Sequence, residues 1–303
     1  MCRDGGYPKK EKMKSKIRNL ALVALLLLSV QSLLVSCDKE DLKVVTAEAE
    51  VAGLQRLDTL TNGDYTFYIY KKDTGNLVVG YNEVFIQLKN NQTGTFVEDA
   101  DLSWTPTMQM TTMSHRCPYS AIHKVSNTST LYSGYFIFIM ASDDMEYWEI
   151  AYNYAIGQDT LAKVSNRPTV VNSTGKIRYK SFIGTDESFY FLALANPTTP
   201  QVGANEITAL LYKKIDKNTF EPVINATIEL DPRMPDMDNH TSPNNENLTY
   251  DSATERYKGK VNLTMTGYWK VNLVVKDATG AILKGNAISS TNSTSAIYFE
   301  LEF

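Results

Sequence analysis

The chain carries one series of short motifs twice in the same order, which restricts its fold to two copies of a small domain. Gly80-Tyr81-Asn82-Glu83 is matched by Gly203-Ala204-Asn205-Glu206, and a strand-like run follows each motif. The further matched pairs are Met108 and Met234, His115 and His240, Tyr132 and Tyr257, Gly134 and Gly259, Met140 and Met265, and Trp148 and Trp269. We place the copies at residues 54–162 and 175–303, with a linker over residues 163–174.

Hydrophobic alternation indicates that both copies are built from β-strands. Ala226, Ile228 and Leu230 alternate with polar residues, and the same period of two recurs from Trp269 to Val275. This period places each apolar set on one face of a strand. Because short strands are separated by turn residues and no long helical pattern follows the N-terminal segment, we predict an all-β chain of two tandem immunoglobulin-like sandwiches. Trp148 and Trp269 are expected to lie in the cores.

The N-terminal segment predicts export and a lipid anchor. A basic stretch precedes an apolar run from Leu20 to Leu28, and apolar character continues to Val35, which is the layout of a secretory signal. The run ends in Leu34-Val35-Ser36-Cys37, which resembles the lipobox of bacterial lipoproteins. We therefore expect a signal peptide over residues 1–36 with Met13 as the true start, and a lipidated Cys37 that opens a linker over residues 37–53.

The predicted location is the cell envelope, with the chain anchored to a lipid bilayer through Cys37 and expected at the outer membrane. Asp38-Lys39-Glu40-Asp41 is similar to the surface-export signal of Bacteroidetes lipoproteins, although a merely solvated linker explains it equally well. After cleavage, Cys117 is the one cysteine besides Cys37, so the fold must do without an internal disulfide.

The composition and motifs argue against several function classes. The net charge of -4 and the lack of a basic cluster make nucleic acid an unlikely partner. The chain has three histidines and none of the common hydrolase, metalloprotease or phosphate-loop motifs, so we do not expect an enzyme. An acidic cluster from Asp143 to Glu149 is interpreted as a solvated hairpin tip.

Sulfur and imidazole groups gather in one segment of each copy. The first copy offers Met108, Met110, Met113 and His115 as metal ligands, with Cys117 as a further candidate. The second copy offers Met234, Met237 and His240. Thioether and imidazole donors suit copper, and soft sulfur selects Cu(I). The alternative is that each loop merely plugs one end of its sandwich, because methionine often fills cores. Met140 and Met265, on alternating stretches, are assigned to the cores.

The second copy resembles the YtkA-like family, which is similar in pattern to the FixH-like proteins. The resemblance rests on the Met234-Pro235 loop with Met237 and His240, on Tyr257-Lys258-Gly259, and on Met265-Thr266-Gly267-Tyr268-Trp269. The first copy lacks the proline after Met108 and has extra residues between Met140 and Trp148. The link to copper comes from the Met/His loop and from similarity to periplasmic copper carriers of the CopC type.

Two functions follow as hypotheses. The first is a membrane-anchored copper carrier or sensor that exchanges metal with an envelope protein partner. The second is a surface binding or assembly module without metal, in which Tyr147, Tyr152 and Tyr154 recognise a glycan or a protein. Exposure of these rings would favour the second hypothesis.

Overall fold

A computed structural model describes residues 46–157 and 161–303 of the chain. The predicted signal peptide, Met13, Cys37 and the acidic motif that follows Cys37 lie outside the described residues. Within the described ranges, no helix has the length and apolar character needed to cross a bilayer.

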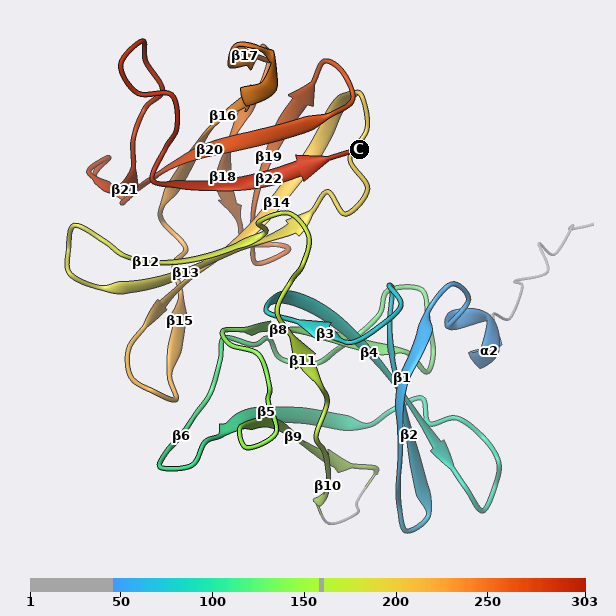
Figure 1. The fold of residues 1–303 in the computed structure, drawn as a ribbon. Coiled ribbons are helices and arrows are strands. Elements are labelled where there is room, and N and C mark those ends of the chain that lie inside the picture. Colours follow the sequence, from blue (N-terminus) through green and yellow to red (C-terminus); the bar gives the residue numbers. More distant parts are fainter. Residues whose placement is uncertain (1–45, 158–160) are drawn as a thin grey trace, which may run out of the picture. The chain divides into compact units, whose positions relative to one another are not determined.

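Two sheets form the first sandwich (Figure 1). One sheet has the order β1 (Gln55–Asn62), β2 (Tyr65–Lys71), β4 (Gly80–Asn90), β8 (Tyr132–Phe138), β7 (His123–Lys124). The other has the order β10 (Ala162–Asn166), β9 (Tyr147–Ala155), β5 (Asp101–Gln109), β6 (Ser114–His115). Alternate residues of β9 are buried, beginning with Trp148, as the period of two predicts. They pack with Phe67, Ile86 and Phe136 from the first sheet.

The second sandwich is a continuous hydrogen-bonded sheet that encloses its own core. Its order is β12 (Tyr179–Ile183), β13 (Phe189–Asn196), β14 (Gly203–Lys214), β19 (Arg256–Leu263), β18 (Glu246–Asp251), β16 (Thr227–Met234), β20 (Tyr268–Lys276), β21 (Ile282–Gly285). Three strands pair beside this path: β15 (Phe220–Pro222) with β14, β17 (His240–Thr241) with β16, and β22 (Ile297–Glu302) with β20. Because β18 pairs with both β19 and β16, the two halves of the sandwich remain connected by hydrogen bonds. The prediction of an all-β, immunoglobulin-like fold is confirmed.

The first sandwich extends beyond the boundaries drawn from the sequence. Most of β10 lies in the predicted linker over residues 163–174, yet β10 pairs with β9 from end to end. In the same stretch, β11 (Val170–Val171) pairs in parallel with β3 (Leu77–Val78), and the Val170 side chain is fully buried. At the other end, α2 (Ala47–Glu50) presents the Glu50 carboxylate, which accepts hydrogen bonds from Thr130. Contacts with strands distant in the sequence therefore make β10, β11 and α2 part of the first sandwich, although the sequence predicts linkers there.

Equivalent hydrogen bonds occur at matched positions of the two sandwiches. The Asn82 amide nitrogen donates to the carbonyls of Val78 and Gly80 at 2.7 and 2.8 Å, and its oxygen accepts from the Val78 amide at 2.9 Å. Asn205 makes the same three bonds to Gln201 and Gly203. Both glycines have positive φ angles, +106° and +103°, which glycine adopts without strain.

Each sandwich has a tyrosine near the start of an inner strand, Tyr132 in β8 and Tyr257 in β19, whose hydroxyl bonds to the backbone of a distant segment. The Tyr257 hydroxyl donates to the Val223 carbonyl at 2.7 Å and accepts from the Ala226 amide at 3.1 Å. The Tyr132 hydroxyl likewise bonds to the Glu98 carbonyl and accepts from the Ala100 amide. Each tyrosine thus ties its strand to the backbone that leads into the opposite half of the sandwich.

A small apolar cluster joins residues of the two sandwiches, which belong to one compact unit. Tyr135 and Ile137 of β8 pack with Phe191 of β13 and Leu210 of β14. The hydroxyls of Tyr135 and Tyr212 lie 2.7 Å apart inside this cluster.

Candidate metal centre

The hairpin between β5 and β6 positions the first group of candidate ligands. Met108 on β5 is the register partner of His115 on β6, and on its other side it pairs with Trp148 on β9. The Met110 amide donates to the Met113 carbonyl at 3.0 Å, which closes the turn between the two strands. Directly opposed residues of antiparallel strands project to the same face, so Met108 and His115 share one face of this hairpin.

The His115 side chain meets the sulfur of Met140, which follows β8. The His115 Nε2 and Met140 Sδ atoms are 3.2 Å apart. On the other side of the ring, Nδ1 lies 2.9 Å from the Arg116 carbonyl oxygen. The Trp148 indole donates to the Met140 carbonyl at 2.9 Å and sets its ring edge-on to the imidazole. The imidazole is therefore held by a contact with the Arg116 carbonyl, and the backbone that carries the thioether is held by the Trp148 indole.

The contact between Nδ1 and the Arg116 carbonyl favours the tautomer of His115 in which Nδ1 carries the proton. A carbonyl only accepts hydrogen bonds, so this contact is a hydrogen bond only when Nδ1 carries a proton. In neutral imidazole the Nε2 atom then has only a lone pair, and a thioether sulfur is also an acceptor. A cation held between Nε2 and Sδ would satisfy both atoms, either as a proton on Nε2 or as a soft metal ion.

The remaining candidates of the first copy lie in different surroundings. Met108 is fully buried and Met110 is half-buried, and both pack in the same core cluster as Met140. Met113 is 47% exposed at the hairpin turn. Cys117 is fully buried in this core, and burial raises the pKa of its thiol well above the usual value. The structure therefore gathers His115 with Met108 and Met140 and leaves Met113 in solvent.

The second copy repeats the strand pairing without the imidazole–sulfur contact. Met234 on β16 is the register partner of His240 on β17, and the Met234 methyl group approaches Gly267 closely. His240 is exposed, and its Nε2 lies 3.5 Å from the Thr264 hydroxyl. Met237 ends the short 3-10 helix η1 (Pro235–Met237) and is 49% exposed. This loop is more open than the hairpin of the first copy.

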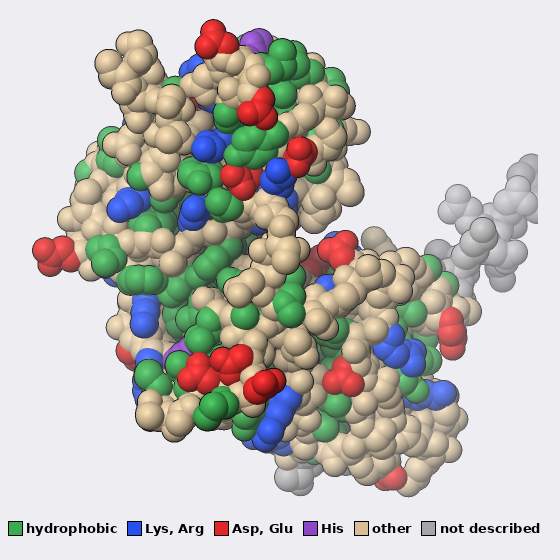
Figure 2. Space-filling view, in the orientation of Figure 1, with side chains coloured by type: hydrophobic (Ala, Val, Ile, Leu, Met, Phe, Trp, Pro, Cys, Tyr) green, Lys and Arg blue, Asp and Glu red, His purple; other side chains and the backbone are tan. Residues whose placement is uncertain are grey.

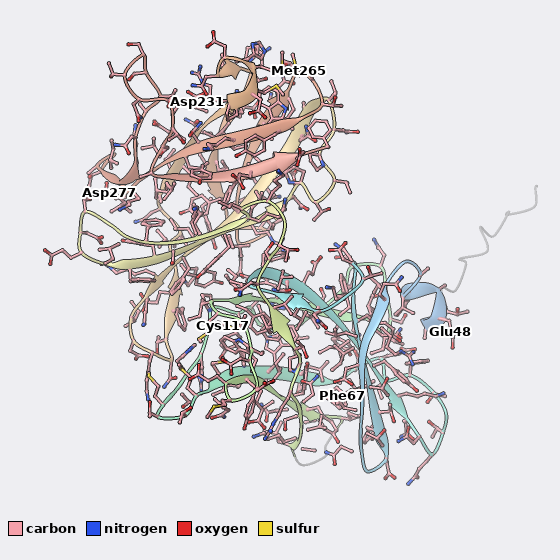
Figure 3. All side chains as sticks on the ribbon, in the orientation of Figure 1. Glu48, Phe67, Cys117, Asp231, Met265 and Asp277 are labelled. Carbon is pink, nitrogen blue, oxygen red and sulfur yellow. The ribbon has the colours of Figure 1, made fainter. Side chains whose placement is uncertain are left out.

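Met140 is not among the metal ligands that the sequence predicts. The sequence predicts a core position for it, as for Met265, and both side chains are half-buried and pack against the core clusters. The Trp269 indole donates to the Met265 carbonyl at 3.0 Å, as the Trp148 indole does to Met140. The available signal was that a methionine precedes the matched tryptophan in each copy, Met140 before Trp148 and Met265 before Trp269, although the spacing differs. Figure 3 labels Met265 and Cys117 among the side chains of the two sandwiches.

Other candidate groups have structural surroundings. Among the described residues, no three His, Cys, Asp or Glu side chains converge as a metal-binding group. The Asp143 carboxylate accepts from the amides of Met145 and Glu146, as expected of a hairpin tip. Tyr152 and Tyr154 are buried, and the Arg167 guanidinium lies 4.0 Å from the centre of the Tyr147 ring. Burial of two of these rings weakens the hypothesis that they form a binding surface.

Charged side chains do not gather by sign on the face shown in Figure 2. Lysine and arginine are interspersed with aspartate and glutamate over both sandwiches in that view. The exposed charges therefore give no large field of one sign on this face.

Residues 189–274 match the family model described as YtkA-like. The matched segment begins at β13 and ends within β20, so it includes Met234, Met237, His240 and Met265. No curated protein matches the sequence of this chain.

Two solved structures show a distant likeness to the chain. A DUF4785 family protein from Legionella pneumophila has 9% identity and a TM-score of 0.25, with 72% of this chain and 53% of that chain covered. The chain thus spans about half the length of that protein. FdeC, an Escherichia coli adhesin, has 13% identity and a TM-score of 0.22, with 77% of this chain and 81% of that chain covered.

Proposed function

We propose that this protein is an exported lipoprotein with two copies of a YtkA-like domain, and that it binds Cu(I) between His115 and Met140 as a carrier or sensor. The observation that carries the proposal is the 3.2 Å separation of His115 Nε2 and Met140 Sδ, two atoms that can each bind a soft metal ion. Typical metal–nitrogen and metal–sulfur distances of about 2.0 and 2.3 Å place two tetrahedral ligands roughly 3.5 Å apart. The pair therefore needs only a small adjustment to hold an ion.

The surroundings of the pair fit a metal ligand set. A metal-bound histidine usually donates its second N–H to a carbonyl or carboxylate, which fixes the tautomer, and His115 does this through Arg116. Met108 lies on the same face, directly opposite His115, and can supply a second thioether. Thioether and imidazole donors without a carboxylate favour Cu(I) over harder ions.

In this proposal the second copy binds the ion more weakly than the first. His240 and Met234 are register partners, while His240 and Met237 are both exposed. An open loop with exposed Met and His ligands suits the exchange of an ion with a partner protein, and a buried site suits its retention. The lipid anchor at Cys37, supported by its lipobox motif, would keep both sites at the outer membrane.

A competition titration against a chromophoric Cu(I) chelator tests this function. The mature chain is expected to withdraw one equivalent of Cu(I) tightly, and Met140→Leu and His115→Ala are each expected to weaken that equivalent at least about tenfold. Met145→Leu is the matched control, because Met145 is 70% exposed at the tip of the hairpin between β8 and β9. Identical titration curves for Met140→Leu and Met145→Leu would contradict the proposal.

A further inference from the structure

A polar pocket lies where loops and strands of both sandwiches meet. Its volume is about 870 Å³. The first sandwich lines it with Lys71 and the segment that follows, as far as Glu83. The second sandwich contributes Arg178, Thr208 and Arg256. A pocket of this size between two domains is a common place for a small ligand.

Two cations in the lining have no carboxylate partner within 4.0 Å among the described residues. Lys71 is 9% exposed, and its Nζ atom donates to the Asn76 carbonyl at 2.8 Å. Arg178 is half-buried and donates to the Ala195 carbonyl at 3.3 Å. Burial lowers the pKa of both groups, although the charge of Asp73 partly opposes this. A buried cation without a close counter-ion is costly, and an anion beside it recovers that cost.

The carboxylates of the lining do not neutralise these two cations. Glu83 is engaged by Lys72 at 2.6 Å and lies 3.9 Å from Arg256. Asp73 and Glu206 are exposed, so solvent and salt screen their charges. The buried part of the lining is therefore positively charged in a chain whose net charge is -4.

Hydroxyl and amide groups also line the pocket. Thr208 is 2% exposed, and its hydroxyl has no hydrogen-bond partner within the protein. Ser133, Asn196 and Thr198 line the same pocket. Buried hydroxyls normally have a hydrogen-bond partner, so the unpaired Thr208 hydroxyl is a candidate contact for a ligand in this pocket.

We propose that this pocket binds a small hydroxyl-rich organic anion, such as a sugar acid or a sugar phosphate, with its anionic group beside Lys71 and Arg178. The hydroxyls of such a ligand would bond to the serine, threonine and asparagine side chains. A charge-assisted bond to arginine is among the stronger polar contacts, so the anionic group should dominate the affinity. This site shares no residue with the metal centre.

Isothermal titration of the full mature chain with four probes tests the proposal. The probes are glucuronate, glucose 6-phosphate, glucose and inorganic phosphate. We expect at least one of the two organic anions to bind, and to bind about tenfold or more tightly than glucose or inorganic phosphate. The preferred organic anion then distinguishes a carboxylate from a phosphate ligand. Binding of inorganic phosphate alone, an adventitious ion only, would overturn the proposal, and so would binding of no probe at millimolar concentration.

Variants locate the site. Arg178→Gln is expected to weaken the organic anion about tenfold or more, while Arg178→Lys retains part of the affinity. Lys214→Gln removes an exposed cation outside the pocket and is expected to change nothing. If Arg178→Gln does not fold, Lys71→Met provides the same comparison. Equal affinities for the pocket variant and Lys214→Gln would contradict the assignment. Because binding should persist with a Cu(I) chelator present, this test is independent of the metal proposal.

Discussion

Replacing Trp148 with alanine is expected to lower the free energy of unfolding of the first sandwich by about 3–5 kcal/mol. The side chain is fully buried and packs edge-on against Phe138 at a centroid distance of 4.9 Å. Alanine would leave a large cavity and remove the indole donor that the Met140 carbonyl uses. Urea denaturation followed by circular dichroism measures the loss.

Two comparisons separate packing from the hydrogen bond of Trp148. Trp148→Phe keeps a ring but removes the N–H donor, so a loss of about 1–3 kcal/mol is expected. Tyr147→Ala changes the preceding residue of β9, which is only half-buried, and should cost about 1 kcal/mol. Equal losses for Trp148→Ala and Tyr147→Ala would show that the buried indole does not organise this core.

Replacing Asn82 with aspartate is expected to destabilise the first sandwich by about 3 kcal/mol or more. The Asn82 amide nitrogen satisfies two carbonyls, those of Val78 and Gly80, in a site that is 7% exposed. A carboxylate would leave both carbonyls without a donor and would repel them. Because this environment disfavours the charged form, the loss should shrink as the pH falls and the new carboxyl becomes protonated. Urea denaturation at several pH values measures both effects.

Asn90→Asp is the matched control for Asn82→Asp. The Asn90 side-chain oxygen accepts from the amides of Gln92 and Thr93 at 2.9 and 3.1 Å, which a carboxylate does equally well. Little change is expected there, while Asn205→Asp should reproduce the loss in the second sandwich. A stable Asn205→Asp variant alongside an unstable Asn82→Asp variant would contradict the equivalence of the two motifs.

Those parts of the fold that depend on local pattern could be predicted from the sequence. The period of two around Trp148 and Trp269 placed both indoles in cores, and both are fully buried. The boundary near residue 163 could not be predicted, because β10 and β11 are held by pairing with strands distant in the chain. The sequence does not indicate with which distant strand such a short segment will pair.

The candidate site was predictable in composition but not in arrangement. The repeat identified a Met and a His at matched positions, and each pair proved to be a register pair in a hairpin. Whether a side chain of the hairpin points into the sandwich or into solvent depends on the turn that joins the two strands. In both hairpins this turn leaves a methionine exposed, Met113 in the first and Met237 in the second. Met140 approaches His115 from the segment that follows β8, a contact that sequence spacing alone does not reveal.

X-ray absorption spectroscopy of the mature chain loaded with one equivalent of Cu(I) tests the central claim most directly. We expect nitrogen at about 2.0 Å and at least one sulfur at about 2.3 Å from copper, with the sulfur contribution reduced in Met140→Leu and retained in Cys117→Ser. A spectrum with nitrogen and oxygen ligands alone, or one that Met140→Leu leaves unchanged, would contradict a copper site between His115 and Met140.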